Sequence, residues 1–198
     1  MEHNQKKRII VGISGASGVE MGYRLLQTLK EFPQVETHLV VSHGARCNFQ
    51  LETALSLEQV YEAADHVYDP KDLAACISSG SYITEGMIVI PCSMKTLAAI
   101  ATGYSDNLLV RAADVCLKEN RRVVLVPRET PLSKIHLRNF LTAAEAGCAI
   151  VPPMLTFYNG ADTLDKQMDH VIGKVLLQFG LTSHRFVPWK GTDSDKNS

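Results

Sequence analysis

The fold is decided by the stretch Arg8-Ile-Ile-Val-Gly12-Ile-Ser14-Gly15-Ala16-Ser17-Gly18. Its first half is a run of β-branched residues typical of a buried strand, and its second half is a turn rich in glycine and serine. The apolar spacing that follows predicts a helix over 18–32. A glycine-rich turn that opens a helix presents free backbone N–H groups and the positive end of the helix dipole. The first strand is therefore predicted to lead into a phosphate-binding turn.

The spacing of the glycines indicates which phosphate compound this turn suits. The dinucleotide fingerprint is G-x-G-x-x-G, with an acidic residue about twenty positions later. Here the spacing is G-x-x-G-x-x-G, and the next apolar run ends in Ser42 rather than in an acidic residue. This pattern disfavours NAD and favours a mononucleotide such as FMN. An ordinary strand-to-helix connection without a ligand remains the alternative.

Composition excludes several classes of protein. With 198 residues, 45% hydrophobic and 21% charged, the chain is expected to form one globular domain over 1–198. The net charge of −1 gives no reason to expect a nucleic acid or an anionic membrane as partner. No apolar run approaches the ~20 residues that span a bilayer. The polar ends, 1–6 and 191–198, are predicted to be disordered tails.

The five cysteines are scattered and form no C-x-x-C pair. This usage favours reduced thiols in the cytoplasm over a disulfide framework or a zinc site. The seven histidines show no H-E-x-x-H spacing, and no G-x-S-x-G motif is present. The sequence therefore predicts neither a metal site nor a serine nucleophile.

Strands and helices alternate along the chain, which predicts an α/β protein with a doubly wound parallel sheet and helices on both faces. The predicted strands are 8–13, 36–41, 86–91, 122–126 and 148–151, with a short one at 66–68. The predicted helices are 18–32, 57–64, 96–101, 108–119, 134–146 and 163–179, and 73–85 is predicted to be a surface loop. Ligands of such sheets bind beyond the carboxyl ends of the strands.

Polar residues follow nearly every predicted strand, so they are expected to converge at that edge. The group comprises Ser14–Ser17, Ser42, Ser93, Lys95, Thr96, Arg128 and Glu129. Ser93 and Thr96 suit either an anionic ligand or an ordinary helix cap. Arg128 offers a phosphate-binding fork, although a solvated turn pair with Glu129 is the alternative. Arg111 and Lys118 share one helix face, where a surface salt bridge is the alternative to a functional role.

Four segments together resemble the flavin prenyltransferases, the UbiX-like proteins once described as aromatic acid decarboxylases. The segments are 15–18, 91–97, 101–119 and 124–137, and the resemblance extends from about residue 7 to Trp189. The cysteine-decarboxylating flavoproteins are a remoter match, since they place an Ala-Asn-Thr segment where this chain has Ser93-Met-Lys-Thr96.

The resemblance implies a Rossmann-like (flavodoxin-like) fold and a specific reaction. Such proteins transfer a dimethylallyl group from dimethylallyl monophosphate to N5 and C6 of reduced FMN, and no metal takes part. They form homo-oligomers, usually dodecamers with sites completed by neighbouring chains. A UbiD-like decarboxylase consumes the product and is the expected functional partner.

The resemblance also assigns roles to individual positions. The FMN contacts of the family match Gly15, Ala16, Ser17, Ser42, Ser93, Met94, Lys95, Thr96 and Arg128. Tyr158 and Lys174 match the contacts to the prenyl phosphate, with Arg128 and Glu129 close to it. Ser17, Glu52, Arg111 and Lys118 match further active-site positions, and Trp189 matches an aromatic residue near the prenyl group. Ser17, Glu52 and the departing phosphate are alternative proton acceptors. A direct FMN-dependent phenolic acid decarboxylase and a non-catalytic FMN carrier remain the alternative functions.

Overall fold

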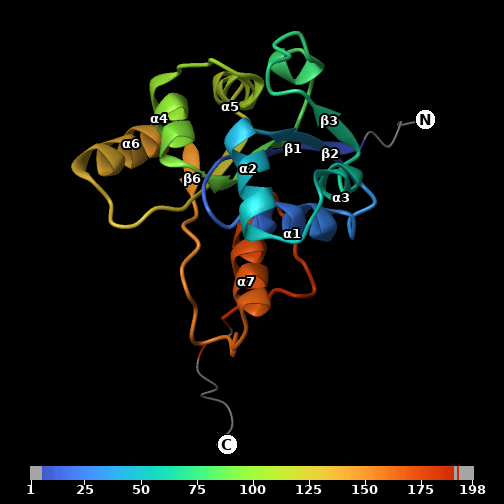
Figure 1. Ribbon diagram of the computed structural model, residues 1–198, viewed down its shortest axis with the longest axis vertical. Helices are drawn as coiled ribbons and strands as arrows, with labels where there is room; N and C mark the ends of the chain where they lie inside the picture. Colours follow the sequence, from blue (N-terminus) through green and yellow to red (C-terminus); the bar gives the residue numbers. More distant parts are fainter. Residues whose placement is uncertain (1–5, 190, 192–198) are drawn as a thin grey trace, which may run out of the picture.

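A six-stranded parallel sheet forms the centre of the protein (Figure 1). The computed structural model describes residues 6–189 and 191, so most of the two predicted tails lies outside the described residues. The strands are β1 (Lys7–Ile13), β2 (Val35–Val41), β3 (His66–Tyr68), β4 (Gly86–Cys92), β5 (Arg122–Pro127) and β6 (Cys148–Ile150). Their order is β3-β2-β1-β4-β5-β6, which confirms the predicted doubly wound sheet.

Helices cover both faces of this sheet. They are α1 (Glu20–Leu29), α2 (His43–Glu52), α3 (Leu57–Glu62), α4 (Met94–Thr102), α5 (Leu108–Lys118), α6 (Lys134–Glu145) and α7 (Leu164–Leu177), with one 3₁₀ turn, η1 (Cys76–Ser78). Figure 1 shows α1 and α7 on one face and α4 and α5 on the other. The two faces are packed by separate groups of buried apolar side chains, one with α1, α2, α3 and α7 and the other with α4, α5 and α6.

The β-branched run of β1 lies at the centre of this core. Alternate residues point to opposite faces, so Ile9 and Val11 pack beneath α1 while Ile10 packs beneath α5. Burial on both faces explains why the predicted strands read as continuous apolar runs. Helix α1 approaches the sheet closely at Gly22, where an added Cβ would come within 2.7 Å of the Ile90 carbonyl oxygen.

The structure differs from the sequence-based expectations in three segments. Helix α2 was not predicted, because only Ala45 and Phe49 of its residues are buried and Gly44 interrupts its first turn. Helix α1 begins at Glu20 instead of residue 18, since Gly18 takes a φ of 91° that a helix does not allow. The predicted loop 73–85 contains η1, whose Ile77 is buried in the core.

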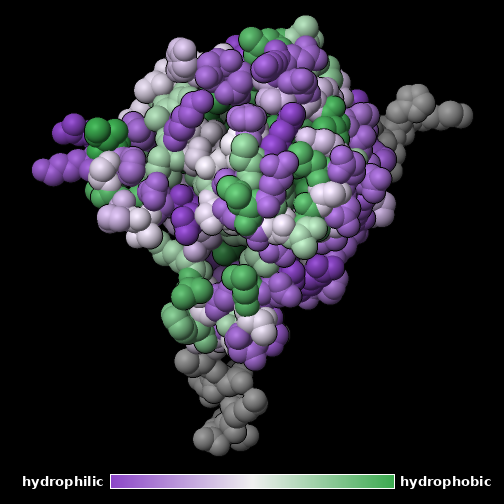
Figure 2. Space-filling view, viewed as in Figure 1, coloured by the Kyte–Doolittle hydropathy of each residue, from purple (hydrophilic) through white to green (hydrophobic). Residues whose placement is uncertain are grey.

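Two segments of the chain each carry several exposed apolar side chains. Helix α6 buries only Ala143, while Ile135, Leu137 and Leu141 are exposed. The segment between β6 and α7 exposes a second set, Met154, Leu155 and Phe157. Figure 2 shows hydrophobic atoms at the α6 end and again at the lower end beside α7. Groups of exposed apolar side chains that form one continuous patch are typical of protein–protein interfaces.

None of the helices in the described part of the chain combines the length and the apolar character needed to cross a membrane.

Candidate functional site

A cavity of about 470 Å³ lies at the carboxyl ends of the central strands. We call it the switch-point cavity, because β1 and β4 are the strands at which the order of the sheet reverses. It is lined by Gly15 after β1, by Ser42 and Gly44 after β2, by Ser93 and Lys95 after β4, and by Asn107 before α5, among others. The structure therefore brings three predicted hydroxyls, those of Ser42, Ser93 and Thr96, and the predicted Lys95 into one cavity wall. Ser17 does not line this cavity.

Three helices begin at the wall of the switch-point cavity. The side chain of Ser42 caps α2 by accepting from the Ala45 N–H at 3.2 Å. Ser93 caps α4, and Asn107 caps α5 by accepting from the Val110 N–H at 3.2 Å. All three caps line the cavity, so the positive ends of three helix dipoles face the same space. A negatively charged group is strongly favoured there.

Ser93 caps the N-terminus of α4 and is hydrogen-bonded to Thr96, so one of the two alternatives considered for these residues, a helix cap, is present. The Ser93 hydroxyl accepts from the Thr96 N–H at 3.3 Å and donates to the Thr96 hydroxyl at 3.1 Å. Both residues nevertheless line the cavity, together with the exposed ammonium group of Lys95. Capping and ligand binding are therefore compatible at this position, because a capped helix terminus retains its dipole and its remaining free N–H groups.

The shape of this edge is set by Ser14 and by two glycines. The Ser14 hydroxyl, fully buried, donates to the Pro91 carbonyl at 3.0 Å and accepts from the Ser93 N–H at 2.7 Å, joining the ends of β1 and β4. A Cβ on Gly15 would lie only 3.1 Å from the Gly44 Cα, so the two turns touch through their backbones. Hydroxyls, backbone amides and a lysine beside an open backbone surface fit a phosphorylated mononucleotide such as FMN.

The Glu52 side chain reaches the glycine-rich turn that contains Ser17. The Glu52 carboxylate, at the end of α2, accepts from the Gly18 N–H at 2.8 Å. Ser17 precedes Gly18 and is half-buried in the same turn. The two predicted active-site residues are thus neighbours although 35 positions separate them in the sequence. Ala16, in the same turn, is buried and does not line the cavity.

A second cavity, of about 350 Å³, lies between α7 and the segment that follows β6. We call it the α7 cavity; its wall includes Tyr158 and Lys174, the two residues matched to the prenyl phosphate. The Trp189 ring packs edge-on against Tyr158, with ring centroids 5.3 Å apart. These three predicted residues therefore form one group, and His170 joins them in the cavity wall. Sequence analysis missed His170, although its i, i+4 spacing to Lys174 would have placed it on the same helix face.

Arg128 and Glu129 follow β5 at the same edge of the sheet. The Arg128 N–H donates to the Cys92 carbonyl at 3.2 Å, and both side chains are exposed. The Glu129 carboxylate accepts from the Thr130 N–H at 2.9 Å. Neither residue lines either cavity, and Met94 does not line the switch-point cavity although its neighbours do.

Arg111 and Lys118 line neither of these two cavities. Arg111 donates to the Asp114 carboxylate at 2.7 Å and to the Ser78 carbonyl at 3.2 Å. Lys118 pairs with Glu119 at the end of α5. The salt-bridge alternative accounts for both side chains within one chain, and the structure does not bring them to the other predicted site residues.

Cys92, at the end of β4, is fully buried. Burial raises the pKa of its thiol far above the ordinary value, because a thiolate would lose its hydration there. Burial also raises the pKa of Cys116 and Cys148, to about 11 in each case. These thiols stay protonated at neutral pH, so none of the three is suited to be a nucleophile.

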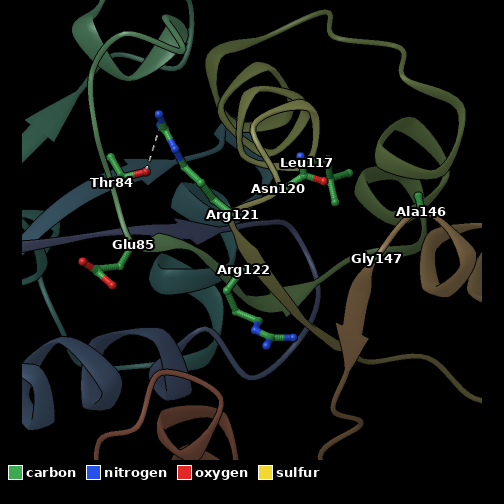
Figure 3. A pocket seen from close by; sticks show the side chains of 8 residues that line it. All are labelled: Thr84, Glu85, Leu117, Asn120, Arg121, Arg122, Ala146 and Gly147. Atoms are coloured by element: carbon green, nitrogen blue, oxygen red, sulfur yellow. Dashed lines mark hydrogen bonds between the residues drawn. The ribbon is translucent and has the colours of Figure 1, made fainter.

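A third cavity, of about 440 Å³, lies at the opposite end of the strands (Figure 3). Its wall includes Arg122, the first residue of β5, and Gly147, just before β6. Arg121 is already bound through its guanidinium to the Tyr82 carbonyl at 2.8 Å. The helices that end beside this cavity, α5 and α6, present the negative ends of their dipoles, which disfavours an anionic ligand.

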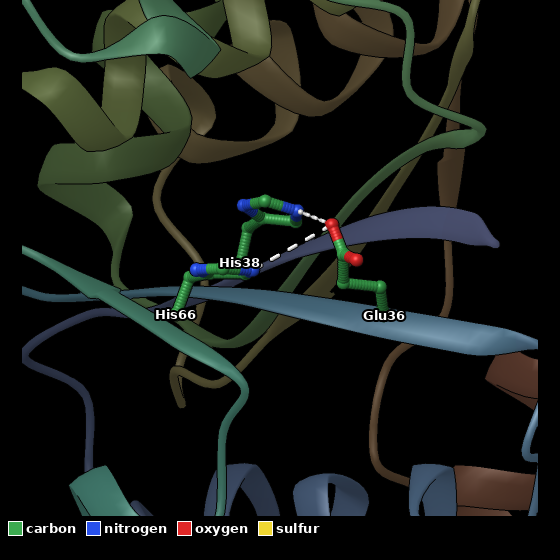
Figure 4. A group of neighbouring side chains, drawn as sticks. All are labelled: Glu36, His38 and His66. Carbon is green, nitrogen blue, oxygen red and sulfur yellow. Dashed lines mark hydrogen bonds and ion pairs between the residues drawn. The ribbon is translucent and has the colours of Figure 1, made fainter. Parts of the chain in front are cut away.

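Glu36, His38 and His66 form a cluster on β2 and β3, with their ligating atoms within 4.8 Å of one another (Figure 4). The two imidazole rings are stacked, with centroids 4.7 Å apart and planes 16° from parallel. A metal ion must lie in the plane of each ring that binds it, which stacked rings do not allow. The Arg8 guanidinium also holds the Glu36 carboxylate at 3.2 Å. This arrangement suits a hydrogen-bonded network better than a metal centre.

Comparison with known proteins identifies the family. The family model described as "Flavoprotein" matches residues 1–175. A probable UbiX-like flavin prenyltransferase of Sedimentibacter hydroxybenzoicus is 60% identical over 188 residues, which are 95% of this chain and 100% of the relative. The flavin prenyltransferase UbiX of Salmonella typhimurium is 52% identical over 187 residues, covering 93% of this chain and 99% of the relative.

Solved structures of similar proteins agree with the sequence comparisons. A dodecameric FMN-dependent UbiX-like decarboxylase from Escherichia coli O157:H7 superposes with a TM-score of 0.91 at 54% identity, covering 93% of this chain and 100% of that one. AnUbiX (PadA1), solved with FMN and dimethylallyl pyrophosphate, gives a TM-score of 0.92 at 46% identity, covering 94% and 99% of the two chains. The chain therefore belongs to the flavoprotein family and, within it, to the UbiX-like flavin prenyltransferases.

Proposed function

We propose that this protein transfers a dimethylallyl group from dimethylallyl monophosphate to N5 and C6 of reduced FMN, without a metal ion. The observation that carries the proposal is the pair of cavities. One is surrounded by three helix N-termini, and the other holds Tyr158 and Lys174 beside Trp189. Relatives of high identity bear the name flavin prenyltransferase, and AnUbiX was solved with FMN and dimethylallyl pyrophosphate.

In this proposal the switch-point cavity holds the flavin. Gly15, Ser42, Ser93, Lys95 and Thr96 would contact it, as hydroxyl, amide and ammonium donors suit a phosphate and a polar ring edge. Ala16, Ser17, Met94 and Arg128 complete the proposed set from neighbouring positions. Reduced FMN supplies the two nucleophilic positions, N5 and C6.

The residues of the α7 cavity would act on the allylic phosphate. Breaking its C–O bond leaves negative charge on the phosphate, which the Lys174 ammonium in the cavity wall would stabilise. The Arg128 guanidinium, which lies outside this wall at the end of β5, would add a second positive charge. The Tyr158 hydroxyl donates a hydrogen bond to the same group, and the Trp189 ring stabilises positive charge on the allyl carbons. Glu52 and Ser17, both at the Gly18 turn, and the departing phosphate are the alternative acceptors that we propose for the proton that C6 loses. Glu129, which follows Arg128 at the end of β5, completes the proposed set.

We further propose that the chain works as a homo-oligomer, a dodecamer like the Escherichia coli O157:H7 relative. The exposed apolar residues of α6 and of the 154–157 segment support association with other copies. A neighbouring chain would bring its Arg111 and Lys118 to the site, which explains why one chain holds them away from it. A UbiD-like decarboxylase would consume the product. Five free cysteines are consistent with the reducing cytoplasm as the compartment.

Anaerobic turnover tests the proposal. With reduced FMN and dimethylallyl monophosphate, the protein should yield a flavin about one C5 unit heavier. Lys174→Ala should weaken binding of the allylic phosphate and leave FMN binding nearly unchanged, while Lys174→Arg, which keeps the charge, serves as the control. A flavin that binds without gaining mass would support a carrier instead. Release of carbon dioxide from a phenolic acid by the protein alone would support a decarboxylase.

A further inference from the structure

One buried titratable side chain takes no part in the chemistry described so far. His170, on α7, is 5% exposed and lines the α7 cavity. It lies one helical turn before Lys174, so both side chains belong to the same face of α7. Most buried polar groups are satisfied by a hydrogen bond. Within the described part of the chain, His170 makes none.

The two ring nitrogens of His170 have different surroundings. Nδ1 is buried and has no hydrogen-bond partner among the described residues. Nε2 is not completely buried and has no hydrogen-bond partner among the described residues; because His170 lines the α7 cavity, we infer that Nε2 faces it. A proton on Nδ1 would be an N–H group shut away from any acceptor, whereas a proton on Nε2 can reach a ligand. The neutral ring therefore carries its proton on Nε2.

The packing around the ring fixes its orientation. Tyr158 meets it edge-on, with centroids 5.8 Å apart and planes at 84°. Phe186 packs on it from the C-terminal segment, with centroids 5.3 Å apart. Held between two aromatic rings, His170 has little freedom to turn. Its free Nε2 is thus presented to the cavity at a constant position beside Tyr158, and such preorganised donors bind a ligand without an ordering cost.

The charge state of the ring matches a site that already holds a cation. Burial lowers the pKa of His170, and the nearby Lys174 ammonium lowers it further. The ring is therefore neutral at neutral pH and adds a hydrogen-bond donor without repelling Lys174. A second permanent charge at this position would carry a desolvation cost that a neutral donor avoids.

We propose that His170 is a third phosphate-binding residue of the α7 cavity, donating a hydrogen bond from Nε2 to the phosphate that Lys174 and Tyr158 hold. This inference rests on the proposed function, because that function supplies the phosphate monoester. Lys174 provides a positive charge for the phosphate, while His170 and Tyr158 donate hydrogen bonds that fix its orientation. The apolar part of the same wall, which includes Val171 and Met154, is left for the hydrocarbon portion of the substrate.

Binding measurements on four variants test the inference. The dissociation constants of dimethylallyl monophosphate and of FMN are measured by calorimetry for the wild type and for His170→Phe, His170→Gln and His170→Asn. A glutamine amide reaches the place of Nε2, whereas an asparagine amide reaches only the place of Nδ1. The exposed His66, on β3, supplies the matched control His66→Phe, which should match the wild type.

We expect His170→Phe to weaken binding of dimethylallyl monophosphate about tenfold to a hundredfold, the range for a hydrogen bond to a charged group. His170→Gln should recover most of the lost affinity for dimethylallyl monophosphate, whereas His170→Asn should not. The dissociation constant of FMN should stay within about twofold of the wild-type value in every variant. Equal affinities for the Gln and Asn variants would overturn the inference, even if the Phe variant fails to fold. If the wild type binds the phosphate in this His170-dependent way but transfers nothing, the inference stands and only the proposed function fails.

Discussion

Replacing Ser14 by alanine tests whether the edge of the sheet is built as described. The Ser14 hydroxyl is fully buried and joins the Pro91 carbonyl to the Ser93 N–H. The Pro91 carbonyl would keep a partner in Ser14→Ala, because the Ser14 backbone N–H also donates to it at 3.2 Å. The Ser93 N–H would keep none. The substitution therefore leaves one part-buried donor without a protein partner, which costs about 1–3 kcal/mol.

For a chain of this size that loss corresponds to a decrease in Tm of about 2–12 °C. Urea denaturation of the flavin-free protein gives the free energy directly. Because Ser93 also caps α4 at the switch-point cavity, the affinity for FMN should fall as well, by about twofold to tenfold. Ser81→Ala, which removes an exposed hydroxyl, is the control and should stay within about 0.5 kcal/mol of the wild type. If Ser14→Ala were as stable as this control and bound FMN equally well, the proposed link between β1 and β4 would be refuted.

Two further predictions concern pH and packing. Burial lowers the pKa of His38 and of His170 below their ordinary 6.5, so the folded chain binds fewer protons than the unfolded chain. The contribution of these two histidines to stability is therefore complete above about pH 6.5 and is lost as the pH falls through their pKa values in the folded state. The urea midpoint should be lower at about pH 5.5 than at about pH 7.5. Equal midpoints would contradict the prediction. In Gly173→Ala the added Cβ would overlap the Phe186 ring, which should lower the free energy of unfolding by about 1–3 kcal/mol. The fluorescence emission of Trp189, the only tryptophan in the sequence, should shift as well. An unchanged emission spectrum and Tm would contradict this packing.

The sheet was predictable from local sequence, because β1, β2 and β4 are buried on both faces and their β-branched runs record that burial. The strand-end residues of the switch-point cavity were predictable for a similar reason, since parallel strands place their carboxyl ends at one edge. Helix α2 was not predictable in this way, because only two of its side chains are buried and its apolar pattern is correspondingly weak. Ser42, which precedes it, is nevertheless a typical N-cap residue.

The α7 cavity depends on contacts that no local pattern records. Tyr158 reaches His170 and Trp189 only because an irregular segment returns along α7. Residue spacing says nothing about where such a segment lies, so Tyr158 and Trp189 were recognised through resemblance alone. The pairing of Arg111 with Asp114, by contrast, follows from i, i+3 spacing on one helix and was anticipated as the ordinary alternative.

The helix caps of the switch-point cavity lie after β2, after β4 and between α4 and α5, with Ser42 and Asn107 65 residues apart in the sequence. A growing chain must be synthesised as far as α5 before all three helix N-termini exist, so its earlier part cannot form the complete flavin site. Bound flavin then stabilises only the completed fold. The free energy of unfolding rises with the free flavin concentration [L] by RT ln(1 + [L]/Kd). In a cell short of flavin, the empty protein should therefore open more often and be degraded sooner than the loaded one.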